Sequence, residues 1–581
     1  MKKMNLIYLF FIYSFFLILS LFIWDHIDVG RKEQNDFFRF YLFITLSFFF
    51  IHFFLKKFKF INYSFSLVIN LPLTVKLKDN SLNLLYFFFL FCIFFIFFSN
   101  DSLNLVFLDV YHDGFYLTPS MNYVLSKKLW TGSFVEAGFF SNYKSLLYFF
   151  FKGKITVGST IFIEHVFTFL NKVVLISLAF LVTKELYFSK SHKIIFLVLF
   201  SLALFYITDS SSSTSYFLSR HFFYLIFIML IFFNLNPSTK LSLVISSVLL
   251  GVVTFISLFW WVDIFIFICL LLSTYLFFLY KKYQVNKLKY ISFGFTLSLL
   301  IALYFFPKNE IIFFLENIYY IIVKANKFTS IAYPSPLFGN DGRATKTLIL
   351  FFYSLILFIL LLHRKTDNLS NTLKQFLIFL FLSSVVSFLY GLGRSDSYHI
   401  IQSTGLLMFN LIFYHLFFMF SFFKKNNLII KKIIFYPIIL LLLSPFLMDN
   451  INNNSIKNIL KFKKNTSDFL EAEDNVFLSK KDLNYLKLIT YYNNLLKKDE
   501  CIQVLTDETI ISYIVKRKTC SKFFFYHILA DEKIQLKFID ELISNKPRFV
   551  LYKSDLLHFN YFDRLRLVDD FINKTFFVND Q

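Results

Sequence analysis

Long apolar segments recur along the first 450 residues of the chain, and they restrict its fold more than any other feature. A helix needs about 20 residues to cross the hydrocarbon core of a bilayer, so each long apolar run predicts a transmembrane helix. We therefore predict a polytopic α-helical membrane protein with about 13 spans. The predicted spans cover residues 5–24, 38–55, 83–99, 160–183, 194–208, 221–235, 241–260, 262–280, 290–306, 347–362, 375–390, 401–423 and 433–448.

Lysine and arginine are distributed unevenly between the predicted loops. With a cytoplasmic N-terminus, basic clusters such as Lys56–Lys59, Lys281–Lys289 and Lys424–Lys432 fall on the cytoplasmic side, where such loops are normally retained. The first apolar run, Leu6–Trp24, is long for a signal peptide and lacks a small-residue cleavage site, so we expect it to remain as a span. The external segments are then residues 100–159, 209–220, 307–346, 391–400 and the tail from 449.

The chain is strongly basic, with a formal net charge of 59 − 37 = +22. A charge of this sign raises the question of nucleic-acid binding. However, no zinc-finger spacing, basic helix or RNA-binding motif is present, and many of the basic residues belong to short loops between spans. We therefore predict membrane lipid and a phosphate-bearing substrate as partners, and no nucleic acid.

The composition changes after the last predicted span. Residues 449–470 are polar and are predicted to form a linker between a transmembrane domain, 1–448, and a C-terminal domain, 471–581. Strand-like runs at 499–506 and 548–552 alternate with helix-like segments, a pattern that favours a small α/β domain with a parallel sheet. Cys501 and Cys520 lie in this domain, and we predict a disulfide between them because the topology places it in an oxidising compartment, with two buried thiols as the alternative.

Two polar clusters stand out against this apolar background. The first is Asp109, His112 and Asp113, followed by Gly114, in the long external loop. Two carboxylates and an imidazole within five residues can supply a general base and orient a hydroxyl nucleophile. Asp109 and Asp113 could also bind a divalent metal, although the spacing is not specific for one. A solvated polar loop is the structural alternative.

The second cluster is Arg394, Asp396 and His399, in a turn between two spans. Arginine binds phosphate through two parallel hydrogen bonds, and the neighbouring groups can complete such a site. A helix cap built by the serines and aspartate of the turn is the alternative.

Further ionisable residues lie within the predicted spans or at their external ends. They are Glu164, next to His165; Arg220, next to His221; and Asp263, after a tryptophan pair, and they are candidates for substrate binding. A charge at membrane depth is costly and usually faces a partner or a cavity. The sequence lacks phosphate-binding loop, dinucleotide, zinc-protease and serine-hydrolase motifs, which argues against those enzyme classes.

In combination, these features resemble the GT-C superfamily of integral-membrane glycosyltransferases. The resemblance rests on the acidic loop Asp109–Gly114, the junction Trp260–Asp263, the turn Gly393–His399 and the tail with its two cysteines. It implies transfer of a sugar from a polyprenyl-phosphate carrier to an acceptor hydroxyl of a cell-envelope glycan, lipid or protein. It also implies location in a bacterial inner membrane with a periplasmic C-terminal domain.

The resemblance further implies roles for individual residues. Asp109 or Asp113 would act as the base, with Asp109 preferred, while Arg394, His399 and Arg220 would bind the donor phosphate. Loop 307–346 would cover the donor. Two alternatives are a transporter or flippase, which usually carries ionisable groups near the membrane midplane, and a polysaccharide polymerase or ligase.

Overall fold

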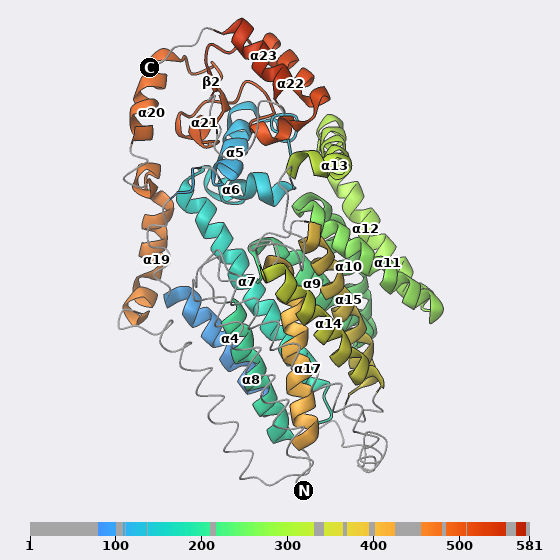
Figure 1. Cartoon of the computed structure of the whole chain (residues 1–581). Helices are drawn as coiled ribbons and strands as arrows, with labels where there is room; N and C mark the ends of the chain where they lie inside the picture. Colours follow the sequence, from blue (N-terminus) through green and yellow to red (C-terminus); the bar gives the residue numbers. More distant parts are fainter. Residues whose placement is uncertain are drawn as a thin grey trace.

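The structure is a computed structural model, and it describes residues 80–99, 108–110, 112–135, 137–208, 216–329, 342–363, 369–393, 401–423, 455–478, 484–506, 508–552 and 565–576. The spans predicted at 5–24, 38–55 and 433–448 lie outside the described residues. Figure 1 shows a bundle of long helices with a group of shorter elements at one end.

Six helices of the described chain are long and apolar enough to cross a membrane, as expected for a helical membrane protein. These are α4 (Asn80–Ser99), α7 (Val157–Lys184), α10 (Lys240–Trp260), α11 (Val262–Lys281), α12 (Val285–Phe305) and α15 (Asn371–Gly393, apolar over Asn371–Phe388). Four other predicted spans are also helices: α8 (Lys190–Thr208), α9 (Phe222–Leu235), α14 (Gly342–His363) and α17 (Gly405–Phe423).

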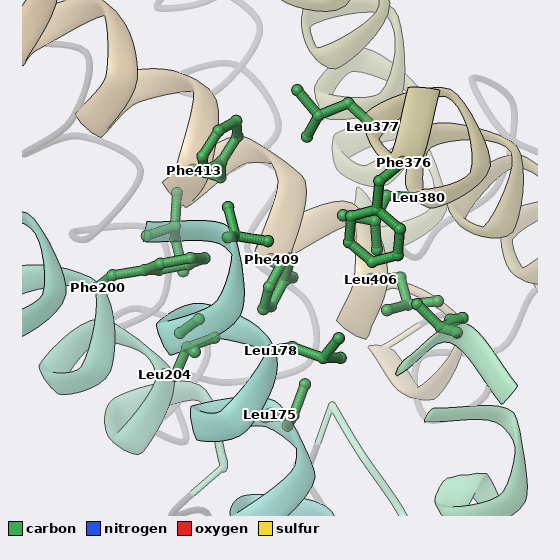
Figure 2. Packing of buried hydrophobic residues seen from close by; sticks show 14 of the residues in the cluster. Leu175, Leu178, Phe200, Leu204, Phe376, Leu377, Leu380, Leu406, Phe409 and Phe413 are labelled. Carbon is green, nitrogen blue, oxygen red and sulfur yellow. The ribbon is translucent and has the colours of Figure 1, made fainter. Parts of the chain in front are cut away.

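The bundle has a central helix and peripheral ones. Helix α17 is buried on all sides, and Figure 2 shows Phe409 and Phe413 packed among side chains of α7, α8 and α15. A helix that is hydrophobic all round belongs at the centre of a bundle. Helix α12 is the opposite case, because apolar side chains such as Leu300 (58% exposed) and Phe305 (71%) point away from the protein. Lipid is the natural neighbour for that face.

Helices α10 and α12 approach each other closely at two glycines. A Cβ added to Gly251 would lie 2.1 Å from the carbonyl oxygen of Ile291, and one added to Gly294 would lie 2.1 Å from that of Val248. Small residues allow such backbone contact between membrane helices, where packing rather than hydrophobicity drives association.

We predict that Gly294→Ala destabilises the protein, although alanine is intrinsically the better helix former by about 1 kcal/mol. The new methyl group must push α12 away from the backbone of α10, at a cost of about 1–3 kcal/mol. Thermal unfolding in detergent measures the effect. Ser292→Ala, at an exposed position of the same helix, is the control and should not lower the midpoint; equal midpoints for both variants would contradict the close-packed seam.

The shorter elements at one end of the bundle come from distant parts of the sequence (Figure 1). The segment before α7, predicted as the first external loop and called by that name below, supplies α5 (Gly114–Ser126) and α6 (Phe139–Lys152), and residues 308–329 form α13 (Lys308–Thr329). The rest come from the C-terminal region: η4 (Asp474–Phe477), α20 (Asn484–Leu495), β1 (Gln503–Leu505), α21 (Ile511–Ile514), η5 (Tyr526–Ala530), α22 (Glu532–Asn545), β2 (Val550–Tyr552) and α23 (Arg566–Thr575). Strands β1 and β2 pair in parallel, with Val504 opposite Leu551, as the alternating pattern predicts.

The C-terminal region packs directly on the first external loop. The Thr118 hydroxyl donates a hydrogen bond to the Thr509 carbonyl (2.8 Å), and the Thr519 amide donates one to the Asn122 side chain (2.9 Å). Phe115 and Phe134 of the loop share a hydrophobic cluster with Phe523, Phe524 and Phe525. These partners are separated by almost 400 residues, so the sequence pattern gave no sign of their contact.

The structure describes residues 455–470 of the segment predicted as a linker. From residue 455 onward they form a helix, α19 (Ser455–Glu471), which packs beside α4. Its Phe462 ring contacts the rings of Phe97 and Phe98 at 5.9 and 4.6 Å between centroids. The segment is polar on average but amphipathic, and such a helix is stabilised by packing of its apolar face rather than by composition.

The structure contains a disulfide between Cys501 and Cys520, and both cysteines are buried. Cys501 lies two residues before β1, and Cys520 directly follows Thr519. The free cysteines of the described chain, Cys92 and Cys269, lie in α4 and α11.

We predict that Cys501→Ser/Cys520→Ser lowers the free energy of unfolding of the C-terminal region by about 3 kcal/mol, because the unfolded chain then loses a constraint on a 19-residue separation. Unfolding with and without dithiothreitol, followed by limited proteolysis, measures the loss. A Cys92→Ala/Cys269→Ala variant should keep the sensitivity of the parent to reductant; a parent insensitive to reductant would contradict the prediction.

Candidate functional site

Asp109 and His112 form an exposed pair just before α5. The Asp109 carboxylate lies 2.6 Å from His112 Nδ1 and also accepts a hydrogen bond from the His112 amide (3.1 Å). The side chains are 54% and 65% exposed, respectively. A carboxylate that orients an imidazole at the protein surface is an arrangement suited to proton transfer.

Asp113 has a different environment from Asp109. Its carboxylate accepts a hydrogen bond from the Asp109 amide (2.9 Å), while the Asp113 amide donates to the Asp109 carbonyl (2.9 Å). Burial raises the pKa of Asp113, and the nearby Lys144 ammonium opposes that rise. The side chain therefore fixes the backbone of Asp109, and the two carboxylates are not equivalent.

Lys144 lies beneath this loop in α6 and is 5% exposed. Its ammonium is 2.6 Å from the Glu164 carboxylate of α7 and 3.5 Å from the centroid of the Tyr116 ring. Glu164 in turn accepts a hydrogen bond from the Ser219 hydroxyl. The ion pair thus connects the external loop to the segment that begins α9, and it gives Glu164 the charged partner expected for a carboxylate in a span.

Arg220 follows Ser219 and contacts the Trp260–Asp263 junction. Its guanidinium lies 5.0 Å from the Trp261 ring and donates a hydrogen bond to the Gln402 side chain (3.0 Å). The Trp261 indole N–H donates to the Asp263 carboxylate (3.3 Å). A cation over an aromatic face beside a carboxylate and an amide is a polar, planar surface that can contact a sugar or a phosphate.

The external loop also holds the tryptophan junction in place. The Val262 amide donates to the Ala137 carbonyl (2.7 Å), and the Trp260 ring stacks on Phe140 at 4.2 Å between centroids. The Trp260 indole N–H donates to the Arg220 carbonyl (3.2 Å). The Trp260–Asp263 junction is therefore fixed by contacts with both the loop and the segment just before α9.

The second predicted cluster, Arg394, Asp396 and His399, lies outside the described residues, as does the end of the 307–346 loop at 330–341. The part of that loop before residue 330 is helix α13. Its buried Glu310 accepts hydrogen bonds from the Trp130 and Thr131 amides (2.6 and 2.8 Å), so this end of the loop is anchored to the first external loop.

Asp109 and Asp113 do not fit a shared divalent metal. One carboxylate oxygen of Asp109 contacts His112 Nδ1. The Asp113 carboxylate accepts a hydrogen bond from the Asp109 amide and is influenced by the Lys144 charge. In the described part of the chain no three His, Cys, Asp or Glu side chains gather as a metal site would require.

Several residues of this polar region were missed by the sequence analysis. Lys144, Tyr116, Ser219 and Gln402 have no distinctive motif around them. The one available signal was a lysine inside the apolar run Tyr143–Phe151, because a charged residue on an interfacial helix often has a specific partner.

We predict that Gly114→Ala disturbs the site by separating α5 from the C-terminal region. The added Cβ would lie 2.0 Å from Thr509 Oγ1 and 2.5 Å from the Ile510 amide nitrogen, so backbone must move, at a cost of about 1–3 kcal/mol. Thermal unfolding measures the cost. Gly153→Ala is the control, since nothing lies within 4 Å of its new Cβ and only the strain of a left-handed alanine, about 1 kcal/mol, is expected; an equal or smaller loss for Gly114→Ala would refute the tight contact.

No protein-family model matches this chain, and no curated protein matches it significantly in sequence.

Proposed function

We propose that this protein is a membrane glycosyltransferase that moves a sugar from a polyprenyl-phosphate carrier to an acceptor hydroxyl at the external membrane face. The donor would reach the site from the lipid, and the acceptor from the external space. The acceptor would be a glycan, lipid or protein of the cell envelope.

One observation carries the proposal. The exposed Asp109–His112 pair and the Arg220–Trp261 surface lie at the same end of an apolar helix bundle, joined through Lys144, Glu164 and Ser219. A reaction between a lipid-borne phosphate and a water-soluble hydroxyl needs a base and a phosphate-binding cation at such a boundary.

The chemistry assigns a different task to each side of the site. Asp109, aided by His112, would accept the proton of the acceptor hydroxyl, whose oxygen forms the new bond to the anomeric carbon of the sugar. The bond from that carbon to the carrier phosphate breaks, and the phosphate leaves with both bonding electrons. Arg220, with Arg394 and His399, would neutralise the leaving phosphate. We assign the base to Asp109 because its side chain is exposed, whereas the Asp113 carboxylate is engaged by the Asp109 amide.

We predict that Asp109→Asn lowers turnover about 10²–10⁴-fold, the usual contribution of a general base. The measurement is release of label from a panel of radiolabelled hexosyl and pentosyl polyprenyl phosphates by protein in membranes. Arg394→Ala and Arg220→Ala should mainly weaken binding of the donor, which an undecaprenyl-phosphate binding assay reports.

Asp540→Asn is the matched control, because Asp540 is an exposed aspartate of α22 in the C-terminal region, and its turnover should equal that of the parent. Full activity of Asp109→Asn would exclude Asp109 as the base. A folded parent that consumes no donor yet moves a lipid-linked substrate across vesicles would instead establish the transporter alternative.

A further inference from the structure

Lys144 is the point at which two sets of contacts meet. On the side of α5, its ammonium lies 3.5 Å from the centroid of the Tyr116 ring, and the Tyr116 amide donates a hydrogen bond to the Asp113 carbonyl (3.1 Å). The Lys144 charge also acts on Asp113, whose carboxylate accepts a hydrogen bond from the Asp109 amide at 2.9 Å. Towards the bundle, its ammonium pairs with Glu164 at 2.6 Å, and Glu164 holds Ser219, the neighbour of Arg220. One side chain therefore contacts or acts on both parts of the site.

The charges explain why a cation is needed at this position. Asp113 and Glu164 repel each other, since each carboxylate raises the cost of ionising the other. The buried Lys144 ammonium attracts both carboxylates. Its ion pair with Glu164 and its contact with the Tyr116 ring at 3.5 Å fix its position. Without the cation, the loop and the span would lose their electrostatic link and gain a repulsion.

We propose that Lys144 is a positioning residue that couples the Asp109 loop to the Arg220 surface, so that base and phosphate-binding group keep the separation that transfer requires. This inference rests on the proposed glycosyltransferase function. Lys144 does not touch substrate; it acts through Asp113 on one side and through Glu164 on the other.

The acid limb of the pH–activity profile distinguishes this role from simple structural support. The charged groups facing Asp113 are Lys144 from α6, Glu164 from α7 and Asp109 from its own loop. Loss of Lys144 removes the cation that opposes the burial effect, so the pKa of Asp113 rises further. Asp113 then takes up a proton at higher pH and holds the Asp109 amide less well. We therefore expect the acid limb of Lys144→Met to move to higher pH, with kcat reduced at least tenfold.

Two experiments separate the coupling role from a merely structural one. The charge swap Lys144→Glu/Glu164→Lys keeps an ion pair between α6 and α7 but places a carboxylate beside Asp113. We expect it to restore thermal stability relative to Lys144→Met without restoring kcat. Recovery of kcat in the swap would overturn the proposal, because it would show that only the pairing of the helices matters.

The second experiment is a double-mutant cycle that avoids new charges. If Lys144 acts through Asp113, then Lys144→Met should lower kcat much less in an Asp113→Asn background than in the parent. If Lys144→Met lowered kcat by the same factor in both backgrounds, the proposal would be overturned. This test holds even if the charge-swap variant fails to fold. Lys152→Met, an exposed lysine of the same helix, is the matched control and should leave kcat and the pH profile unchanged.

A distance measurement that needs no substrate tests the role of Lys144 separately from the proposed glycosyltransferase activity. Spin labels at Leu125→Cys on α5 and Ile266→Cys on α11, both exposed positions, report the distance between the loop and the bundle in a background lacking Cys92 and Cys269. We expect a narrow distribution in the parent and a broader one in Lys144→Met. An unchanged distribution would overturn the coupling, whereas a parent without turnover but with the expected broadening would remove only the glycosyltransferase assignment.

Discussion

Every backbone amide and carbonyl within hydrocarbon must be hydrogen-bonded inside the protein, and the architecture of this chain follows from that requirement. Its apolar segments form helices, and α8, α14 and α15 pack around α17, which is buried on all sides. Where side chains are small, as at Gly251 and Gly294, helix backbones come into direct contact. Where helices face outward, as along α12, large apolar side chains are exposed. The bundle provides a rigid base for the polar elements at one end.

The polar end is built from three parts of the chain that are far apart in sequence. The first external loop supplies α5 and α6, the segment after α12 supplies α13, and the C-terminal region closes over them. Glu310 joins α13 to the loop, and Asn122 joins the loop to Thr519 beside the disulfide. The C-terminal region is thus part of the structure that supports the Asp109 loop, rather than a separate tail joined only by a linker.

The ionisable side chains of this region have different surroundings, which the composition does not reveal. Asp109 and Asp113 are four residues apart and chemically identical, yet the first is exposed beside an imidazole. The second accepts a hydrogen bond from the Asp109 amide and is influenced by the Lys144 ammonium. Their different surroundings make the two carboxylates chemically unequal, and the base that we propose is the exposed one. Glu164, a candidate for substrate binding from the sequence, forms an ion pair with Lys144.

The sequence by itself determined the helical membrane class, because hydrophobicity and segment length are local properties. It also marked as strand-like the two runs that contain β1 and β2, whose parallel pairing the structure shows. It also singled out Asp109, His112, Asp113, Glu164, Arg220 and Asp263 as residues out of place in an apolar chain. Only the tertiary structure decided their partners: Lys144 for Glu164, Trp261 and Gln402 for Arg220, and Thr509 against Gly114. It also made a helix of the polar segment around Phe462. These outcomes depend on contacts between residues up to about 400 positions apart. Charge and spacing along the chain do not specify which distant surfaces pack together when apolar faces are buried.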